Sequence, residues 1–423
     1  MGLCLRTCLM AGAILCILGE GVQGQEPDAP SPGGRPTSGP VPASSPTTAA
    51  AGEDEVATWL GLRPRLTEAG VTPILSYILD SSRNFRGGLN THDWALRHLL
   101  TAGLDMDMEK VAGIKGGEFY ATFIDHHGSN GSALTGDIQM YSSIDANSRD
   151  ELYEVWYQQK LLDDKLRLKV GKIDATKEFA FTDNGADFLS SPMGFSPALV
   201  DFPTYPDPTY GLSIYAYPSD WLYAGFGYFD RGLQEEWPVG SPAPVNSGQF
   251  LIGEVGAKWK LGANELPGRL GLGAYGHTGT FEEFGGGLLD GTAGPYAVFD
   301  QTLWRPSPQD KEDKRQLGAF FQYGGADERI SKVTQHVGAG LAWRGLVPGR
   351  PSDVLGAGLT RVELSDEPAA GFSARHETAV ETFYKVVLTP WLSVTPDLQY
   401  TANPGGNGTP DALVGTIRLQ VSW

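Results

Sequence analysis

Residues 412–423 read ALVGTIRLQVSW, and this stretch decides the fold class. Its apolar side chains fall at every second position, from Leu413 to Trp423. The positions between them carry polar groups, among them Arg418 and Gln420. Because successive side chains of a β-strand point to opposite faces, the stretch predicts a strand with one apolar and one polar face.

Residues 377–388 and 391–402 repeat the same alternation. Their polar faces carry Glu377, Glu381 and Lys385 in the first segment and Asp397 and Gln399 in the second. Strands of about ten residues are typical of membrane-spanning β-barrels, whereas strands of globular proteins average about five or six. The pattern therefore favours a transmembrane barrel, in which the apolar face meets lipid and the polar face lines a wet lumen. A secreted β-sandwich with its apolar face packed inward remains the alternative.

The composition excludes several classes of function. The chain has 423 residues, and its 50 acidic against 32 basic side chains give a formal charge of −18. Such an excess of acid argues against nucleic-acid binding, which requires a basic surface to neutralise phosphates. A membrane-spanning helix needs about 20 consecutive apolar residues, and no stretch after the N-terminal region reaches that length.

The N-terminal residues have the layout of a secretory signal peptide. Arg6 precedes an apolar run from Leu9 to Leu18, and small residues precede a predicted cleavage after Gly24. All of the chain's 3 cysteines fall within residues 1–24, so the mature chain would contain no thiol ligand and no disulfide. Residues 25–55 are rich in Pro, Ser, Thr and Ala and are predicted to be a disordered arm. The barrel is predicted to occupy residues 56–423.

Several fragments, in a fixed order, resemble one family. The central signature runs Leu152-Tyr153-Glu154-Val155-Trp156-Tyr157-Gln158-Gln159, then Lys165-Leu166-Arg167-Leu168-Lys169-Val170-Gly171-Lys172-Ile173-Asp174-Ala175 and Glu178-Phe179-Ala180. Flanking matches are Asn84-Phe85-Arg86-Gly87-Gly88, Ser142-Ser143-Ile144-Asp145-Ala146, Asp187-Phe188-Leu189-Ser190-Ser191, Phe202-Pro203-Thr204-Tyr205-Pro206, Tyr210-Gly211-Leu212, and Pro396 to Gly406. Together they resemble the carbohydrate-selective porin family of the OprB type, from Trp59 to Trp423.

The resemblance implies an all-β fold, a transmembrane antiparallel up-and-down β-barrel of sixteen strands in a bacterial outer membrane. It implies passive diffusion of carbohydrates such as glucose or maltooligosaccharides, with outer-membrane lipid around the wall and no enzymatic reaction or cofactor. A homo-trimer is possible within this reading, and the sequence leaves the number of associated barrels open. Two features depart from the family pattern: the last residue is Trp423 rather than Phe, and the Pro-rich arm is not part of the family core.

The alternation nominates side chains for the lumen. Glu154, Trp156 and Gln158 share a face that we expect to lie opposite Tyr153, and Arg167 and Lys169 share another. With the three C-terminal segments, the substrate-binding candidates are Glu154, Trp156, Gln158, Arg167, Lys169, Glu377, Glu381, Lys385, Asp397, Gln399, Arg418 and Gln420. Charged groups of both signs and an aromatic ring suit the hydroxyls and the apolar face of a sugar.

Each candidate also has a purely structural interpretation. Arg167 and Lys169 could pair with lumen carboxylates only to stabilise the wall, and Trp156 could pack beneath an inward loop or lie at the membrane interface. Glu377 and Glu381 are four residues apart on a strand, about 13–14 Å, which is too far for a glycosidase pair. A general or cation-selective porin is the alternative function, since the net charge is strongly negative.

Two motifs are interpreted as carrying no site. His126-His127, followed by Gly128, is interpreted as a loop without the clustered partners that a metal site needs. A Gly-x-Gly-x-x-Gly pattern begins at Gly271, but it stands in a glycine-rich strand rather than at the strand-to-helix turn that binds nucleotides.

Overall fold

The computed structural model describes residues 61–231, 242–306 and 313–423. The predicted signal peptide and the predicted arm, residues 1–24 and 25–55, lie outside the described residues. Everything below concerns the described part of the chain.

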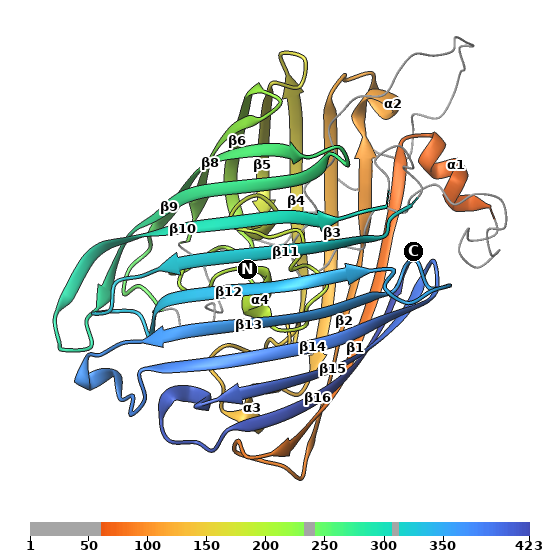
Figure 1. Ribbon diagram of the computed structural model, residues 1–423. Coiled ribbons are helices and arrows are strands. Elements are labelled where there is room, and N and C mark those ends of the chain that lie inside the picture. The colour runs from red at the N-terminus through yellow and green to blue at the C-terminus, as the bar shows by residue number, and fades with distance from the viewer. Residues whose placement is uncertain (1–60, 232–241, 307–312) are drawn as a thin grey trace, which may run out of the picture. The chain divides into compact units, whose positions relative to one another are not determined.

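Sixteen β-strands make up most of the described residues. They are β1 (Val71–Arg86), β2 (Trp94–Asp107), β3 (Gly117–Gly128), β4 (Arg149–Leu161), β5 (Leu166–Ile173), β6 (Thr209–Ser219), β7 (Leu222–Asp230), β8 (Gln249–Leu261), β9 (Leu266–Glu282), β10 (Leu288–Trp304), β11 (Gln316–Gly325), β12 (Val333–Arg344), β13 (Val354–Leu364), β14 (His376–Thr389), β15 (Leu392–Ala402) and β16 (Ala412–Ser422). Each pairs antiparallel with its neighbour in sequence, and β1 pairs with β16, so the sheet closes into a barrel (Figure 1).

The closure confirms the predicted fold class and its sixteen strands. A closed barrel leaves no unpaired strand edge, so the wall strands satisfy most of their backbone groups within the sheet. The alternative of a two-layered β-sandwich is wrong, because one continuous sheet returns to its own first strand.

The direction of the side chains follows the predicted alternation. On β16, Thr416 is buried inside the barrel, whereas Ile417 is 51% exposed on the outside. On β14, Glu381 is buried and Val380 is exposed. Aliphatic side chains outside and polar side chains inside are the reverse of a soluble core, and they match a wall surrounded by lipid.

One strand departs from the simple alternation. The pairing of β3 with β4 shifts register between Thr122 and Phe123, where Thr122 faces Glu154 and Phe123 faces Leu152. The intervening Tyr153 is therefore an extra residue, and it is buried inside beside Glu154. The expectation that Tyr153 lies opposite Glu154 is wrong, because a β-bulge interrupts the two-residue period.

The helices are short. They are α1 (Leu62–Glu68), α2 (Met108–Ala112), α3 (Ser132–Thr135) and α4 (Ser191–Gly194), with 3-10 turns at Ala175–Lys177, Pro368–Ala370 and Pro404–Gly406. Among the described residues, none of the helices has the length and apolar character needed to cross a membrane.

The connections between strands differ at the two ends of the barrel. At one end they are short, such as residues 162–165, 220–221 and 390–391. At the other end two are long, residues 129–148 between β3 and β4 and residues 174–208 between β5 and β6. We call these the first and the second inward segment, since many of their residues are buried and they bind the inner wall. In outer-membrane barrels the short turns are periplasmic and the long loops extracellular.

Candidate functional site in the barrel interior

The second inward segment is bound to the far wall by carboxylates. Asp300 on β10 accepts the backbone N–H groups of Asp183 and Asn184, each at 2.9 Å. Glu381 on β14 accepts those of Leu189 and Ser190, at 2.6 and 3.0 Å. Because the segment leaves from β5 and reaches β14, it crosses the interior of the barrel.

Further contacts fix the path of this segment along the wall. Glu254 on β8 accepts the backbone N–H of Ala180 at 3.2 Å and the hydroxyls of Tyr223 and Tyr296 at 2.6 and 3.0 Å. The ring of Tyr296 lies against Gly273 on β9, where an added Cβ would stand 2.2 Å from a ring carbon. The Gly-x-Gly-x-x-Gly pattern thus belongs to a strand, as expected. One of its glycines, Gly273, leaves the space that the ring of Tyr296 occupies.

The first inward segment is anchored in the same way on the neighbouring part of the wall. Glu377 on β14 accepts the backbone N–H groups of Ile138 and Gln139 at 2.9 and 3.0 Å, and that of Gly405 at 2.6 Å. A carboxylate that accepts several N–H bonds is a strong, charge-assisted anchor. Glu377 and Glu381 each bind a different inward segment, so neither carboxylate is free to act as a catalytic acid or base.

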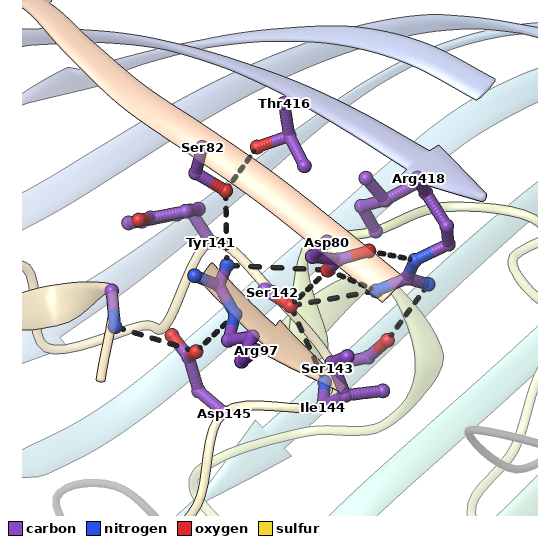
Figure 2. Close-up of polar contacts among 12 residues, drawn as sticks. Asp80, Ser82, Arg97, Tyr141, Ser142, Ser143, Ile144, Asp145, Thr416 and Arg418 are labelled. Atoms are coloured by element: carbon purple, nitrogen blue, oxygen red, sulfur yellow. Dashed lines mark hydrogen bonds and ion pairs between the residues drawn. The ribbon is translucent and has the colours of Figure 1, made fainter. Parts of the chain in front are cut away.

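A second anchor of this segment lies where β1 meets β16 (Figure 2). Ser142 donates to Asp80 Oδ2 at 2.7 Å, and Arg418 binds both oxygens of Asp80 at 2.7 and 2.8 Å. Arg97 on β2 binds Asp145 with Nε and Oδ1 2.6 Å apart. Burial raises the pKa of Asp145 to about 7, although Arg97 opposes that shift.

The twelve residues predicted for the lumen all lie on the inner wall or beneath the inward segments, but most are buried. Those with little or no solvent access are Glu154, Trp156, Gln158, Lys169, Glu377, Glu381, Asp397, Gln399 and Arg418. Only Arg167, Lys385 and Gln420 keep partial exposure.

The central signature residues support the second inward segment. Arg167 and Lys169 both bind Glu178, Lys169 with Nζ and Oε1 2.5 Å apart. Trp156 stacks on Tyr120 with ring centroids 4.8 Å apart, and Lys169 Nζ lies 3.8 Å from the Trp156 centroid. These contacts match the structural interpretation of Lys169 and Trp156, which are buried, whereas Arg167 keeps partial exposure beside its bond to Glu178.

Three side chains that the sequence analysis did not nominate keep solvent access on the inner side of the barrel. Asp183 in the second inward segment and Lys258 on β8 are exposed, and Tyr217 on β6 is partly exposed. Lys258 Nζ lies 5.9 Å from the Tyr217 centroid and 5.5 Å from the Tyr223 centroid. Arg269, which lies opposite Lys258 on β9, forms an ion pair with Asp300 at 3.6 Å. The sequence could have indicated Lys258, because it lies four residues after Glu254 on β8 and therefore on the same inward face.

The second inward segment also presents an acid that is paired with the wall. Asp187 binds Lys385 at 2.8 Å and Arg344 at 3.3 Å, and all three side chains remain partly exposed. Burial by itself would raise the pKa of Asp187, but Lys385 and Arg344 lower it to about 2. Asp183 behaves differently. Its side chain keeps solvent access, but the protein packed closely around its carboxyl group and the neighbouring Asp300 raise its pKa to about 6, against the opposing effect of Arg269 and Lys258.

The interpretation of His126-His127 as a loop without partners is wrong. Both residues belong to β3, with His126 buried inside and His127 exposed outside. Ligand atoms of Asp125, His127 and Asp150 lie within 4.8 Å of one another. Asp125 lies two residues before His127 on β3 itself, and Asp150 comes from the neighbouring strand β4, a pairing that a pattern read along one strand does not show.

Comparison with known proteins identifies the family. The model of the carbohydrate-selective porin family, OprB, matches residues 91–423. The chain is 25% identical to Porin B of Pseudomonas aeruginosa, over 86% of this chain and 89% of that protein.

Solved structures share the fold. A high-pH structure of Pseudomonas putida OprB superposes with a TM-score of 0.74 at 22% identity, covering 86% of this chain and 97% of that one. A low-pH structure of the same protein gives a TM-score of 0.56 at 20% identity, covering 90% and 100%. Since the family match spans most of the chain, this protein belongs to the OprB carbohydrate-selective porins, a channel family of the Gram-negative outer membrane.

Proposed function

We propose that the barrel lets neutral mono- and small oligosaccharides diffuse passively through a bore narrowed by the second inward segment. In this proposal the sugar contacts Asp183, Tyr217, Lys258 and the accessible part of Arg167. The family match and the likeness to Porin B support a sugar porin, and the inner wall supplies these contacts.

One observation carries the proposal. Most charged side chains inside the barrel are buried in ion pairs or in hydrogen bonds to the inward segments, whereas Asp183 and Lys258 remain exposed within the barrel. A carboxylate accepts hydrogen bonds from sugar hydroxyls, an ammonium group donates to them, and the face of Tyr217 offers a surface for the apolar side of the ring. Because the two charges have opposite sign, they bind hydroxyls without a strong preference for anions or cations.

Weak binding is a requirement of this function. A channel must hold its solute well enough to admit it and loosely enough to release it. Exposed groups satisfy this requirement, since each sugar hydroxyl exchanges a bond to water for a bond to protein, with a small net gain. The deeply buried pairs would instead need to be broken before they could bind a sugar.

The test is ion conductance in planar lipid bilayers with a panel of sugars. The proposal predicts that glucose and short maltooligosaccharides reduce the current in a graded, saturable way. Current that is unaffected by any sugar, together with a strong cation preference in a salt gradient, would favour the general or cation-selective porin instead.

The proposal includes two features of the mature protein. Export would remove residues 1–24, which N-terminal sequencing of the outer-membrane form would show. Association into a homo-trimer stays a prediction, and chemical cross-linking in the membrane would show trimers if it is correct and monomers if it is not.

A further inference from the structure

Four potential metal ligands gather on the outer wall, away from the bore. His98 lies on β2, Asp125 and His127 on β3, and Asp150 on β4. They share the outward face with the exposed side chains of Leu96, Phe123 and Leu152. All four lie near the end of the barrel from which the first inward segment departs.

The register of the sheet brings these residues together. His98 is directly opposite His127 in the pairing of β2 with β3, and Asp125 is directly opposite Asp150 in the pairing of β3 with β4. Asp125 and His127 are two residues apart and therefore share one face of β3. The four side chains thus occupy adjacent positions across three strands.

The separations of the ligand atoms suit one shared cation. His127 Nε2 lies 3.2 Å from Asp150 Oδ1 and 3.9 Å from Asp125 Oδ1, and His98 Nε2 lies 3.8 Å from Asp125 Oδ1. In tetrahedral zinc sites, ligand bonds of about 2.0–2.1 Å place neighbouring ligand atoms roughly 3.3–3.4 Å apart. Small side-chain rotations would therefore bring these atoms into coordination.

His127 Nε2 and Asp150 Oδ1 are within hydrogen-bond distance at 3.2 Å, but the rest of the arrangement is unfavourable without a cation. Two carboxylates directly opposite each other on neighbouring strands repel, and both belong to a face whose neighbours are aliphatic and aromatic. Asp125 Oδ1 is shielded from solvent and has no hydrogen-bond partner among the described residues, although two imidazole rings face it at 3.8 and 3.9 Å. The ring of His98 also contacts the ring of Tyr77, with ring centroids 5.5 Å apart.

We propose that Asp125, His127 and Asp150, with His98 as the fourth group, form a binding site for a divalent transition metal of the zinc class on the outer wall. Imidazole and carboxylate together suit zinc, whereas calcium and magnesium prefer oxygen ligands alone. A bound cation neutralises the facing carboxylates of Asp125 and Asp150. It also cross-links β2, β3 and β4 next to the point where the first inward segment leaves β3.

The test uses the full chain, purified in detergent without a histidine tag, and isothermal titration with Zn²⁺ and separately with Mg²⁺. We expect one Zn²⁺ site per chain and no comparable Mg²⁺ binding. His127→Ala and Asp125→Asn should each weaken Zn²⁺ binding at least about tenfold, because each removes a ligand. His92→Ala, at an exposed histidine before β2, is the matched control and should leave the affinity unchanged.

A second measurement separates lost binding from lost folding. In gel electrophoresis, an unheated sample shows the mobility of the folded barrel. When samples are heated to increasing temperatures before loading, Zn²⁺ should raise the temperature at which the wild type loses that mobility. Folded His127→Ala and Asp125→Asn barrels should show no such increase. The proposal is overturned if wild type and folded variants bind Zn²⁺ equally, or if the wild type binds none.

Discussion

Asp80 and Arg418 lie directly opposite each other where the first strand of the barrel meets the last. Arg418 Nε and Nη2 bind the two oxygens of Asp80 at 2.7 and 2.8 Å, and both side chains point inward. Ser142 of the first inward segment donates to the same carboxylate at 2.7 Å (Figure 2). One buried carboxylate therefore joins the closing seam of the barrel to a segment that folds into its interior.

Asp80→Asn should destabilise the barrel by about 3–5 kcal/mol, since it leaves the buried Arg418 without its counter-charge. The measurement is the free energy of unfolding in urea, for barrels folded in detergent micelles or vesicles. The matched control is Glu265→Gln, which removes the exposed pair between Lys260 and Glu265 at 3.3 Å and should cost about 0–1 kcal/mol. Equal losses in the two variants would contradict a structural role for the seam pair.

Glu381→Ala should release one attachment of the second inward segment, because Leu189 and Ser190 lose the acceptor of their N–H groups. We expect a larger and noisier single-channel conductance and weaker block by sugar. Glu381→Gln keeps one carbonyl acceptor and should lie between Glu381→Ala and the wild type. Unchanged conductance in Glu381→Ala would show that the segment holds its position without this anchor.

The charge preference of the channel should change with pH through Asp183. Its pKa is raised to about 6, so the side chain is ionised above that value and neutral below it. Cation preference, measured as a reversal potential in a salt gradient, should therefore fall as pH decreases from about 7.5 to about 5. Asp187, with its pKa lowered to about 2, stays charged throughout this range.

Asp183→Asn is the control for this pH dependence and should remove most of it. The same shift affects stability: because the folded protein holds the Asp183 proton more tightly than the unfolded chain does, this residue lowers the free energy of unfolding as pH rises through about 4 to 6. A wild-type reversal potential that does not change over this range would contradict the assignment of Asp183 to the bore.

Lys258→Ala and Tyr217→Ala should each weaken the block of current by sugar several-fold, while the barrel still folds. Lys258 loses a hydrogen-bond donor, and Tyr217 loses the ring on which the sugar rests. Titration of the current with maltotriose gives the binding constants. Gln420→Ala, at a partly exposed inner position on β16, is the comparison that should change sugar binding little. A larger effect there than at Lys258 would place the sugar elsewhere.

Arg167→Ala separates the two interpretations of the central signature. Arg167 binds Glu178 inside the barrel, so its loss should lower the free energy of unfolding as well as change the block by sugar. If only sugar binding changes, Arg167 acts as a bore residue alone. If only stability changes, the structural interpretation is sufficient.

The sequence by itself determined which side chains of the wall strands face inward and which face outward. Alternation with a period of two is a local property, so residues 377–388, 391–402 and 412–423 could be assigned inner and outer faces without any knowledge of their neighbours. Glu381 and Arg418 lie on the predicted side for this reason. The bulge at Tyr153 escaped this reasoning, because one extra residue depends on the partner strand and leaves no periodic signal.

Only the tertiary structure decided which inner side chains stay in water. The two inward segments have no periodic pattern, and the carboxylates that bind them are far away in sequence, as Glu377 is from Ile138, 239 positions apart. These contacts bury most of the predicted lumen residues and leave Asp183 and Lys258 exposed. The cluster around His127 also depends on strand register, since Asp125 and Asp150 meet only when β3 and β4 pair. A face can be read from the order of residues, but accessibility and cross-strand proximity arise only when distant parts of the chain meet.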